Sequence, residues 1–115
     1  MFDFQKLEVY KKSKSFHIAC RSILAKLKPE KYITDQLSRA SYSIVLNIAE
    51  GSAKTSKADR RNYFTTARGS TFECVAILDI LHEEKVLNDV EFNTQLQVAD
   101  EISRLLYTMI KNLAS

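Results

Sequence analysis

The sequence predicts an all-α protein, an antiparallel up-down-up-down four-helix bundle in which residues 1–115 form a single domain. Two observations carry this prediction. The chain has only two glycines and one proline in 115 residues, too few for the many tight turns of a β-rich fold. Apolar residues also recur at helical spacing in four segments of about 20 to 30 residues, and short connections between such segments favour antiparallel neighbours. A chain of this length buries a core without disulfides or metal.

The first expected helix covers about residues 7–28, and Pro29 ends it because proline cannot continue a helix. The second follows Thr34, a residue type that caps helix N-termini with its side-chain oxygen. It is expected to end at Gly51, whose freedom at positive φ suits a C-terminal cap.

The third expected helix covers about residues 57–85 and follows Ser56, whose hydroxyl is placed to cap it. Gly69 interrupts this helix, which indicates either the close approach of another backbone or a kink. Asn88 is the expected N-cap of the fourth helix. The apolar stripe of that helix consists of Phe92, Leu96, Ala99, Ile102, Leu105, Leu106, Met109, Ile110 and Leu113.

The segment QLSRASYSIVLNIAEG, residues 36–51, carries two patterns at helical spacing. One face is small and apolar, as a buried helix requires. The other face is built from side chains that form directional hydrogen bonds instead of the usual Lys and Glu of a solvated face. This polar stripe is either a buried network between helices or part of a recognition surface, and it consists of Gln36, Arg39, Ser43, Asn47 and Glu50.

The sequence offers no arrangement of residues typical of an enzyme. His17 and His82 are the only histidines, and neither a phosphate-binding glycine loop nor a nucleophile elbow is present. Asp79 and His82 have the spacing of half a di-iron helix motif, but the second copy and its glutamates are missing. Cys20 and Cys74 are expected to be buried free thiols. We therefore expect a protein without catalytic residues, metal or cofactor.

No apolar run approaches the roughly 20 residues that cross a bilayer. The opening residues MFDFQKLEVYKK also lack the apolar core of a signal peptide. The sequence therefore predicts a cytoplasmic protein with no membrane partner.

The net charge of +3 conceals a strong asymmetry along the chain. Residues 1–69 contain 14 Lys/Arg and 6 Asp/Glu, whereas residues 70–115 contain 3 and 8. Arginine suits phosphate because its planar fork donates two parallel hydrogen bonds, so a nucleic-acid-binding surface is one interpretation. The alternative is that basic and acidic helices complement each other within or between subunits. The predicted nucleic-acid-binding residues are Lys54, Lys57, Arg60, Arg61 and Arg68.

Apolar residues encircle the expected helix at residues 75–81 instead of occupying one face. A small bundle buries only one side of each helix, so self-association is the natural cover for the excess. The alternative is a broad core stripe with one or two exposed aliphatic side chains. A homo-oligomer would repeat the basic patch on each subunit and produce one large positive surface. The second functional interpretation is a protein-interaction scaffold whose acidic C-terminal half meets a basic partner.

Four segments are distinctive together: residues 36–51, the cap at Ser56, the run ARGS at residues 67–70 with Glu73, and the opening residues 4–11. They resemble the four-helix-bundle family of 23S rRNA intervening-sequence proteins. The resemblance implies a bundle that assembles into a ring, commonly a homopentamer. Members are encoded in insertions within bacterial 23S rRNA genes or stand alone. A related protein is the accessory protein of diversity-generating retroelements, which implies binding of nucleic acid and reverse transcriptase through a basic pentameric barrel.

Carried over to this chain, the motif positions of the family are Gln36, Arg39, Ser43, Asn47, Glu50, Gly51, Arg68, Gly69, Ser70 and Glu73. One departure is that Ser38 precedes Arg39 where the family often has two adjacent arginines, which weakens a nucleic-acid role for that helix. Because the second and third helices should be antiparallel, Arg39 or Asn47 is expected to pair with Glu73, and Glu50 with Arg68. Pairs of that kind would make the motif structural.

Overall fold

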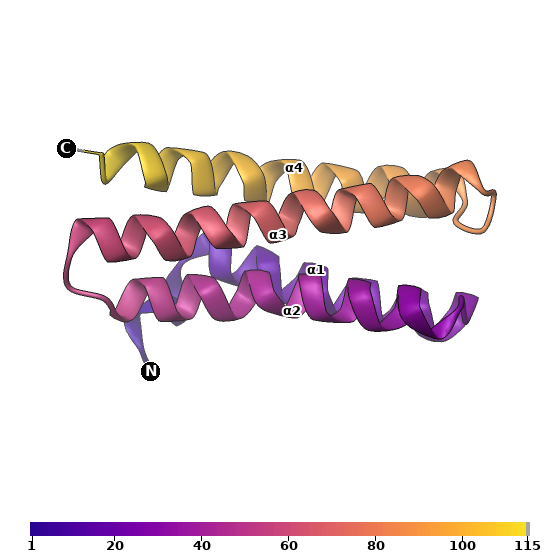
Figure 1. Cartoon of the computed structure of the whole chain (residues 1–115), viewed down its shortest axis with the longest axis horizontal. Coiled ribbons are helices and arrows are strands. Elements are labelled where there is room, and N and C mark those ends of the chain that lie inside the picture. The colour runs from indigo at the N-terminus through magenta and orange to yellow at the C-terminus, as the bar shows by residue number, and fades with distance from the viewer. Residues whose placement is uncertain (115) are drawn as a thin grey trace.

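The computed structural model describes residues 1–114 and shows four α-helices, which confirms the predicted fold class (Figure 1). They are α1 (Glu8–Leu27), α2 (Lys31–Ala53), α3 (Lys57–Glu83) and α4 (Asp89–Asn112), preceded by a short 3-10 helix, η1 (Asp3–Lys6). The chain is 86% helical, and the described residues include no strand. No helix among them combines the length and apolar character of a membrane span.

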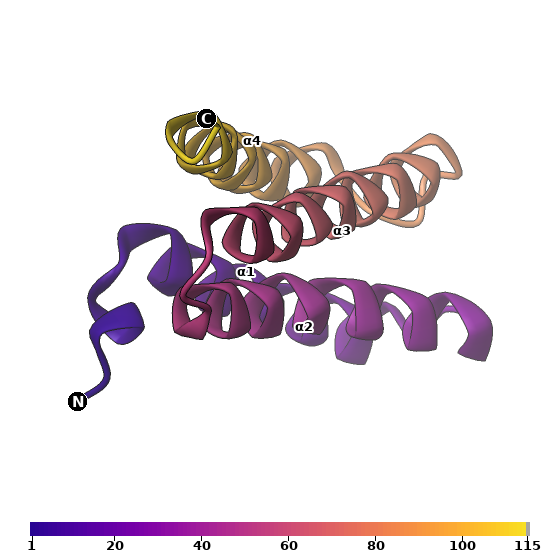
Figure 2. The same ribbon diagram turned by 60° about the vertical axis from the view of Figure 1, so that its left-hand side comes forward.

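The helices alternate in direction, so α1 and α3 run opposite to α2 and α4 (Figure 1). Each helix packs against its neighbours in the chain, and α4 packs against α1, which closes a bundle measuring 44 × 24 × 22 Å (Figure 2). One end holds the N-terminus, the α2–α3 connection and the last turn of α4, and we call it the terminal end (Figure 1). The opposite end holds the α1–α2 and α3–α4 connections, and we call it the loop end.

The core is a single cluster to which all four helices contribute apolar side chains. Cys20 and Cys74 lie within it as free thiols, as expected. Burial raises the pKa of the Cys20 thiol to about 12, which keeps it protonated and unreactive at neutral pH. The largest fully buried side chains include Phe16, Phe64, Leu37, Ile44, Ile48, Leu78, Leu81, Leu87, Ile102 and Leu106.

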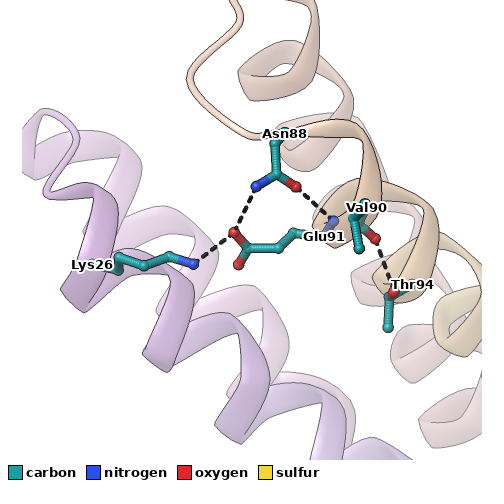
Figure 3. Close-up of polar contacts among 5 residues, drawn as sticks. All are labelled: Lys26, Asn88, Val90, Glu91 and Thr94. Carbon is teal, nitrogen blue, oxygen red and sulfur yellow. Dashed lines mark hydrogen bonds and ion pairs between the residues drawn. The ribbon is translucent and has the colours of Figure 1, made fainter.

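Two of the predicted caps are confirmed. The Ser56 hydroxyl accepts a 3.0 Å hydrogen bond from the backbone N–H of Asp59 at the start of α3. Asn88 Oδ1 accepts from the backbone N–H of Glu91 at 2.8 Å, and Asn88 Nδ2 donates to the Glu91 carboxylate at 3.3 Å (Figure 3). That carboxylate also accepts from Lys26 Nζ at 2.6 Å, so the cap of α4 is linked directly to α1 (Figure 3).

The predicted ends of α2 are wrong at both termini. The helix begins at Lys31, three residues before Thr34, and its N-cap residue, Glu30, makes no capping hydrogen bond with its side chain. At the other end, Gly51 lies inside the helix, which continues to Ala53, and neither glycine has a positive φ. Pro29 lies just before the N-cap residue Glu30, so α2 begins two residues after the proline that separates it from α1.

The close approach that was one of the two interpretations of Gly69 is not found there, and tight packing occurs at Gly51 instead, against side-chain atoms of α3. A Cβ added at Gly51 would lie 2.8 Å from Phe64 Cε1 and 2.9 Å from Tyr63 Cβ. A Cβ added at Gly69 would meet nothing within 4 Å. Gly51 is therefore the glycine that α2–α3 packing requires, while Gly69 faces outward.

Candidate nucleic-acid interface

The five basic residues predicted to bind nucleic acid lie at the terminal end and along the adjoining half of α3. Lys54 directly follows α2, and the other four are on α3. Lys54 and Lys57 are exposed, and Lys54 Nζ lies 5.1 Å above the centre of the Tyr63 ring. Within residues 1–114, none of the five forms an ion pair with a carboxylate.

Arg61 and Arg68 are anchored to α4 by their guanidinium groups. Arg61 Nη1 donates to the carbonyl oxygen of Leu113 at 2.7 Å, where α4 ends and its last carbonyls lack helical partners. Arg68 Nε donates to the carbonyl oxygen of Ser103 at 3.3 Å. Each bond occupies one donor of a group that has five, so both arginines support α3–α4 packing and keep further donors.

Arg60 points to the other side of α3, toward the N-terminal segment. Its side chain borders an open hollow of about 640 Å³ that is also lined by Phe2, Phe4, Ser52 and Ala53. The Nε of Arg60 is buried and finds no acceptor among the described residues 1–114. A buried guanidinium nitrogen without a partner is uncommon, because its desolvation goes uncompensated.

Two exposed aromatic rings flank Arg68 on the α3–α4 face. The guanidinium carbon lies 4.9 Å from the centre of the Phe72 ring and 5.3 Å from that of Tyr107. Phe72 and Tyr107 are 56% and 55% exposed. We call these three residues the Arg68 cluster.

Phe72 and Tyr107 are not among the binding residues that the sequence predicts. Phe72 follows Arg68 by four residues, a spacing that places two side chains side by side on a helix. The sequence therefore contains a local signal for the contact between Arg68 and Phe72. The contact with Tyr107 depends on the register of α4 against α3, which no local pattern reveals.

The polar stripe of α2 lies along the groove between α2 and α3. Gln36 Nε2 donates to Glu73 at 3.4 Å, and the hydroxyls of Ser43 and Ser70 lie 3.0 Å apart. Asn47 Nδ2 turns back to the carbonyl and hydroxyl oxygens of Ser43, at 2.8 and 3.0 Å. At these positions the stripe bonds across to α3 through an exposed Gln36–Glu73 contact and a half-buried Ser43–Ser70 contact, while Asn47 bonds within α2.

The predicted charge pairs across this groove are wrong. Glu73 bonds with Gln36 instead of Arg39 or Asn47, and Arg68 turns toward α4 instead of Glu50. Arg39 and Glu50 are exposed, and neither has an ion-pair partner in residues 1–114. The register of the antiparallel pair places Gln36, one turn before Arg39, opposite Glu73.

The two histidines have separate surroundings. His82 Nε2 lies 2.7 Å from Asp89 Oδ1, and its ring stacks on Phe92 with a centroid separation of 4.2 Å. His17 Nδ1 lies 2.7 Å from the Ser41 hydroxyl. In the described part of the chain, no three His, Cys, Asp or Glu side chains are grouped as metal ligands.

At the loop end, one large apolar residue of the run that encircles α3 is exposed, as in the alternative of a broad core stripe with one or two exposed aliphatic side chains. Leu78 and Leu81 are buried, whereas Ile80 is 56% exposed. Ile80 and the exposed Tyr32 border a hollow of about 240 Å³ between the start of α2 and the end of α3.

Comparison with known proteins identifies the family. The model of the family described as "23S rRNA-intervening sequence protein" matches residues 5–108. A crystal structure of a protein of unknown function from the S23 ribosomal protein family of Bacteroides thetaiotaomicron superposes with a TM-score of 0.83 at 25% sequence identity, covering 90% of this chain and 98% of that one. Among curated proteins, none matches this sequence. The family match over nearly the whole chain, together with the shared fold, shows that this protein belongs to the 23S rRNA-intervening sequence protein family.

Proposed function

We propose that this protein is a non-enzymatic bundle that associates with copies of itself, as a ring, and binds RNA in the bacterial cytoplasm through a repeated basic surface. The basic surface consists of Lys54, Lys57, Arg60, Arg61 and Arg68. The observation that carries the proposal is that none of these five side chains forms an ion pair with a carboxylate within residues 1–114.

The spatial separation of charge supports this assignment. The ion pairs of Lys12 with Glu101 and of Lys26 with Glu91 join α1 to α4, and neither involves the basic surface. Complementarity between basic and acidic helices within one subunit therefore does not account for these five residues. Cations without carboxylate partners are available to neutralise phosphates, and that contact releases the counterions condensed on the nucleic acid, with a favourable entropy.

Self-association strengthens RNA binding in the proposal. One subunit offers five cations, two of which are partly committed to α4. Repetition around a ring makes later phosphate contacts intramolecular, so affinity rises without any new kind of contact. The exposed apolar side chains near the loop end, including Ile80 and Tyr32, are the proposed contact between copies.

The test is fluorescence anisotropy with a labelled, structured RNA across a salt series. Arg61 and Arg68 are poor choices for charge reversal, because their bonds to α4 would be lost with it. The double variant Lys54→Glu/Lys57→Glu reverses two exposed charges. Lys54 lies over the Tyr63 ring, and neither lysine forms an ion pair within residues 1–114. The matched control is Lys28→Glu/Lys85→Glu, which changes the net charge equally at the loop end.

The expected result is wild-type binding that weakens steeply with salt, a marked loss of affinity for the first variant, and a much smaller loss for the control. The salt dependence should also become shallower in the first variant, because fewer counterions are released. Equal losses of RNA affinity in both variants would mean that binding depends on net charge alone and not on this surface. Absence of wild-type binding at low salt would overturn the proposal and favour a protein partner.

A further inference from the structure

The Arg68 cluster exposes aromatic surface that the bundle could have buried. Phe16 and Phe64 are each 1% exposed, so the protein does bury phenylalanine where packing requires it. Phe72 and Tyr107 instead present more than half of their surface to solvent, on adjacent helices and around one guanidinium. Because the guanidinium covers only one face of a ring, area remains open for another planar group.

Arg68 is held in place before any ligand arrives. Its Nε donates to the Ser103 carbonyl oxygen, and its guanidinium carbon lies within 5.3 Å of the centres of both rings. An arginine has five N–H donors, and across residues 1–114 the other four have no acceptor. Little side-chain entropy would be lost when these donors bind an anion.

The charges around the cluster favour an anionic ligand. Arg61 precedes Arg68 by two helical turns on α3, and Lys111 follows Tyr107 by one turn on α4. Because these helices are antiparallel, both cations lie on the terminal-end side of the rings. The nearby carboxylate of Asp100 is bound by Arg104 at 3.0 Å. A hollow of about 190 Å³ adjoins the cluster, lined by Thr71, Phe72, Val75, Ala99, Asp100 and Ser103.

We propose that Phe72, Arg68 and Tyr107 form a binding site for unpaired nucleotides of single-stranded RNA. A base stacks on an open ring face, and the free Arg68 donors bind the adjacent phosphate. Bases in a duplex already stack on one another and expose no face, so this site selects single-stranded segments. The inference rests on the proposed function and specifies the kind of RNA that the basic surface receives.

A contact between copies of this chain fits the cluster less well. If two copies met two-fold through this same face, Arg68, Arg61 and Lys111 would lie against the same charges, and a ring would instead set this face against a different one. Burial of the free Arg68 donors against rings alone would also leave them without acceptors, which is costly. A phosphate satisfies those donors, and a base covers the rings.

The direct test uses tryptophan fluorescence, because the chain contains no tryptophan. Phe72→Trp places a single indole in the cluster. Val90→Trp is the control, since Val90 is 76% exposed at the start of α4 and lies outside both the cluster and the proposed contact between copies. On addition of an oligouridylate, the indole at position 72 should be quenched by base stacking, while a blunt RNA duplex of the same length and the control variant should give no comparable quenching.

A second measurement removes the aromatic faces. Phe72→Leu/Tyr107→Leu keeps apolar bulk at two exposed positions, and its thermal unfolding should match that of the wild type. Oligouridylate affinity should fall by about 5- to 100-fold for each stacked base lost, whereas duplex affinity should hardly change. The variant Lys54→Glu/Lys57→Glu should weaken both.

The outcomes separate the two proposals. If the wild type binds both RNAs and the leucine variant binds them equally well, this inference fails while the proposed function stands. If the wild type binds neither, both fail. If the leucine variant instead lowers the assembled mass in light scattering, the cluster is a contact between copies and the inference is overturned.

Discussion

At the scale of single residues, the two glycines have opposite roles although both lie inside helices. The space beside Gly51 is filled by Phe64 and Tyr63, whereas the space beside Gly69 is open. An alanine gains about 1 kcal/mol over glycine in a helix interior, so the same substitution should have opposite signs at the two sites.

We expect Gly69→Ala to stabilise the protein by about 1 kcal/mol through this gain in helix propensity. Gly51→Ala should destabilise it by about 1 to 2 kcal/mol, because overpacking against the buried Phe64 ring exceeds the gain. Urea denaturation of both variants measures the difference. A destabilised Gly69→Ala variant would contradict the expectation and would indicate that another chain packs on this position.

His17 should make stability depend on pH. Burial, and secondarily the positive charge of Arg21, lower its pKa from the ordinary value of 6.5. The folded chain therefore binds this proton less readily than the unfolded chain, and stability is lost as the pH falls through about 6.5. His17→Gln retains a polar group opposite the Ser41 hydroxyl and should lose less stability between about pH 7.5 and 5.5. Thermal unfolding of both proteins at several pH values checks this, and parallel curves would count against it.

At the scale of elements, the start of each helix differs in how its backbone donors are satisfied. Asn88 and Ser56 cap α4 and α3 with their side chains, whereas the N-cap residue of α2 makes no such bond. The α4 cap is also tied to α1 through Glu91 and Lys26. Loss of the Asn88 cap should therefore weaken the packing of α4 against α1 as well as the start of α4.

We expect Asn88→Ala to destabilise the protein by about 1 kcal/mol or somewhat more, as the loss of an N-cap does. Thr34→Ala is the informative comparison, because Thr34 lies inside α2 and its hydroxyl caps nothing there. It should be neutral or slightly stabilising, since alanine has the higher helix propensity. Denaturation midpoints of the two variants decide this, and a comparable loss at Thr34 would place the start of α2 where the sequence predicted it.

At the scale of the whole molecule, exposed apolar groups predict self-association. Light scattering should give a mass that is a multiple of 13.2 kDa. Ile80→Asp should reduce that mass with little change in the core, because Ile80 is exposed beside Tyr32 and not packed inside the bundle. Val90→Asp, at a position that is 76% exposed at the start of α4, is the control. A wild-type mass of one chain would rule out this contact.

The local patterns of this sequence determined much of the fold. Helical periodicity predicted all four helices, and hydroxyl and amide side chains at Ser56 and Asn88 marked the starts of two of them. These features were readable because apolar spacing and capping depend on residues within a turn or two of each other. The prediction of an N-cap at Thr34 was wrong because it used residue type alone. A capping residue type does not cap a helix that has already begun, and α2 begins at Lys31.

Only the tertiary structure decided which residues meet across helices. Composition and periodicity identified basic residues on α3, but the register of α4 turned Arg61 toward Leu113 and placed Arg68 between Phe72 and Tyr107. The register of α2 against α3 likewise placed Gln36 within hydrogen-bond distance of Glu73 and packed Phe64 so closely on position 51 that glycine is required there. The physical reason is that a helix determines its own faces through its period, whereas the sliding and rotation of one helix against another are set by the packing of the entire core.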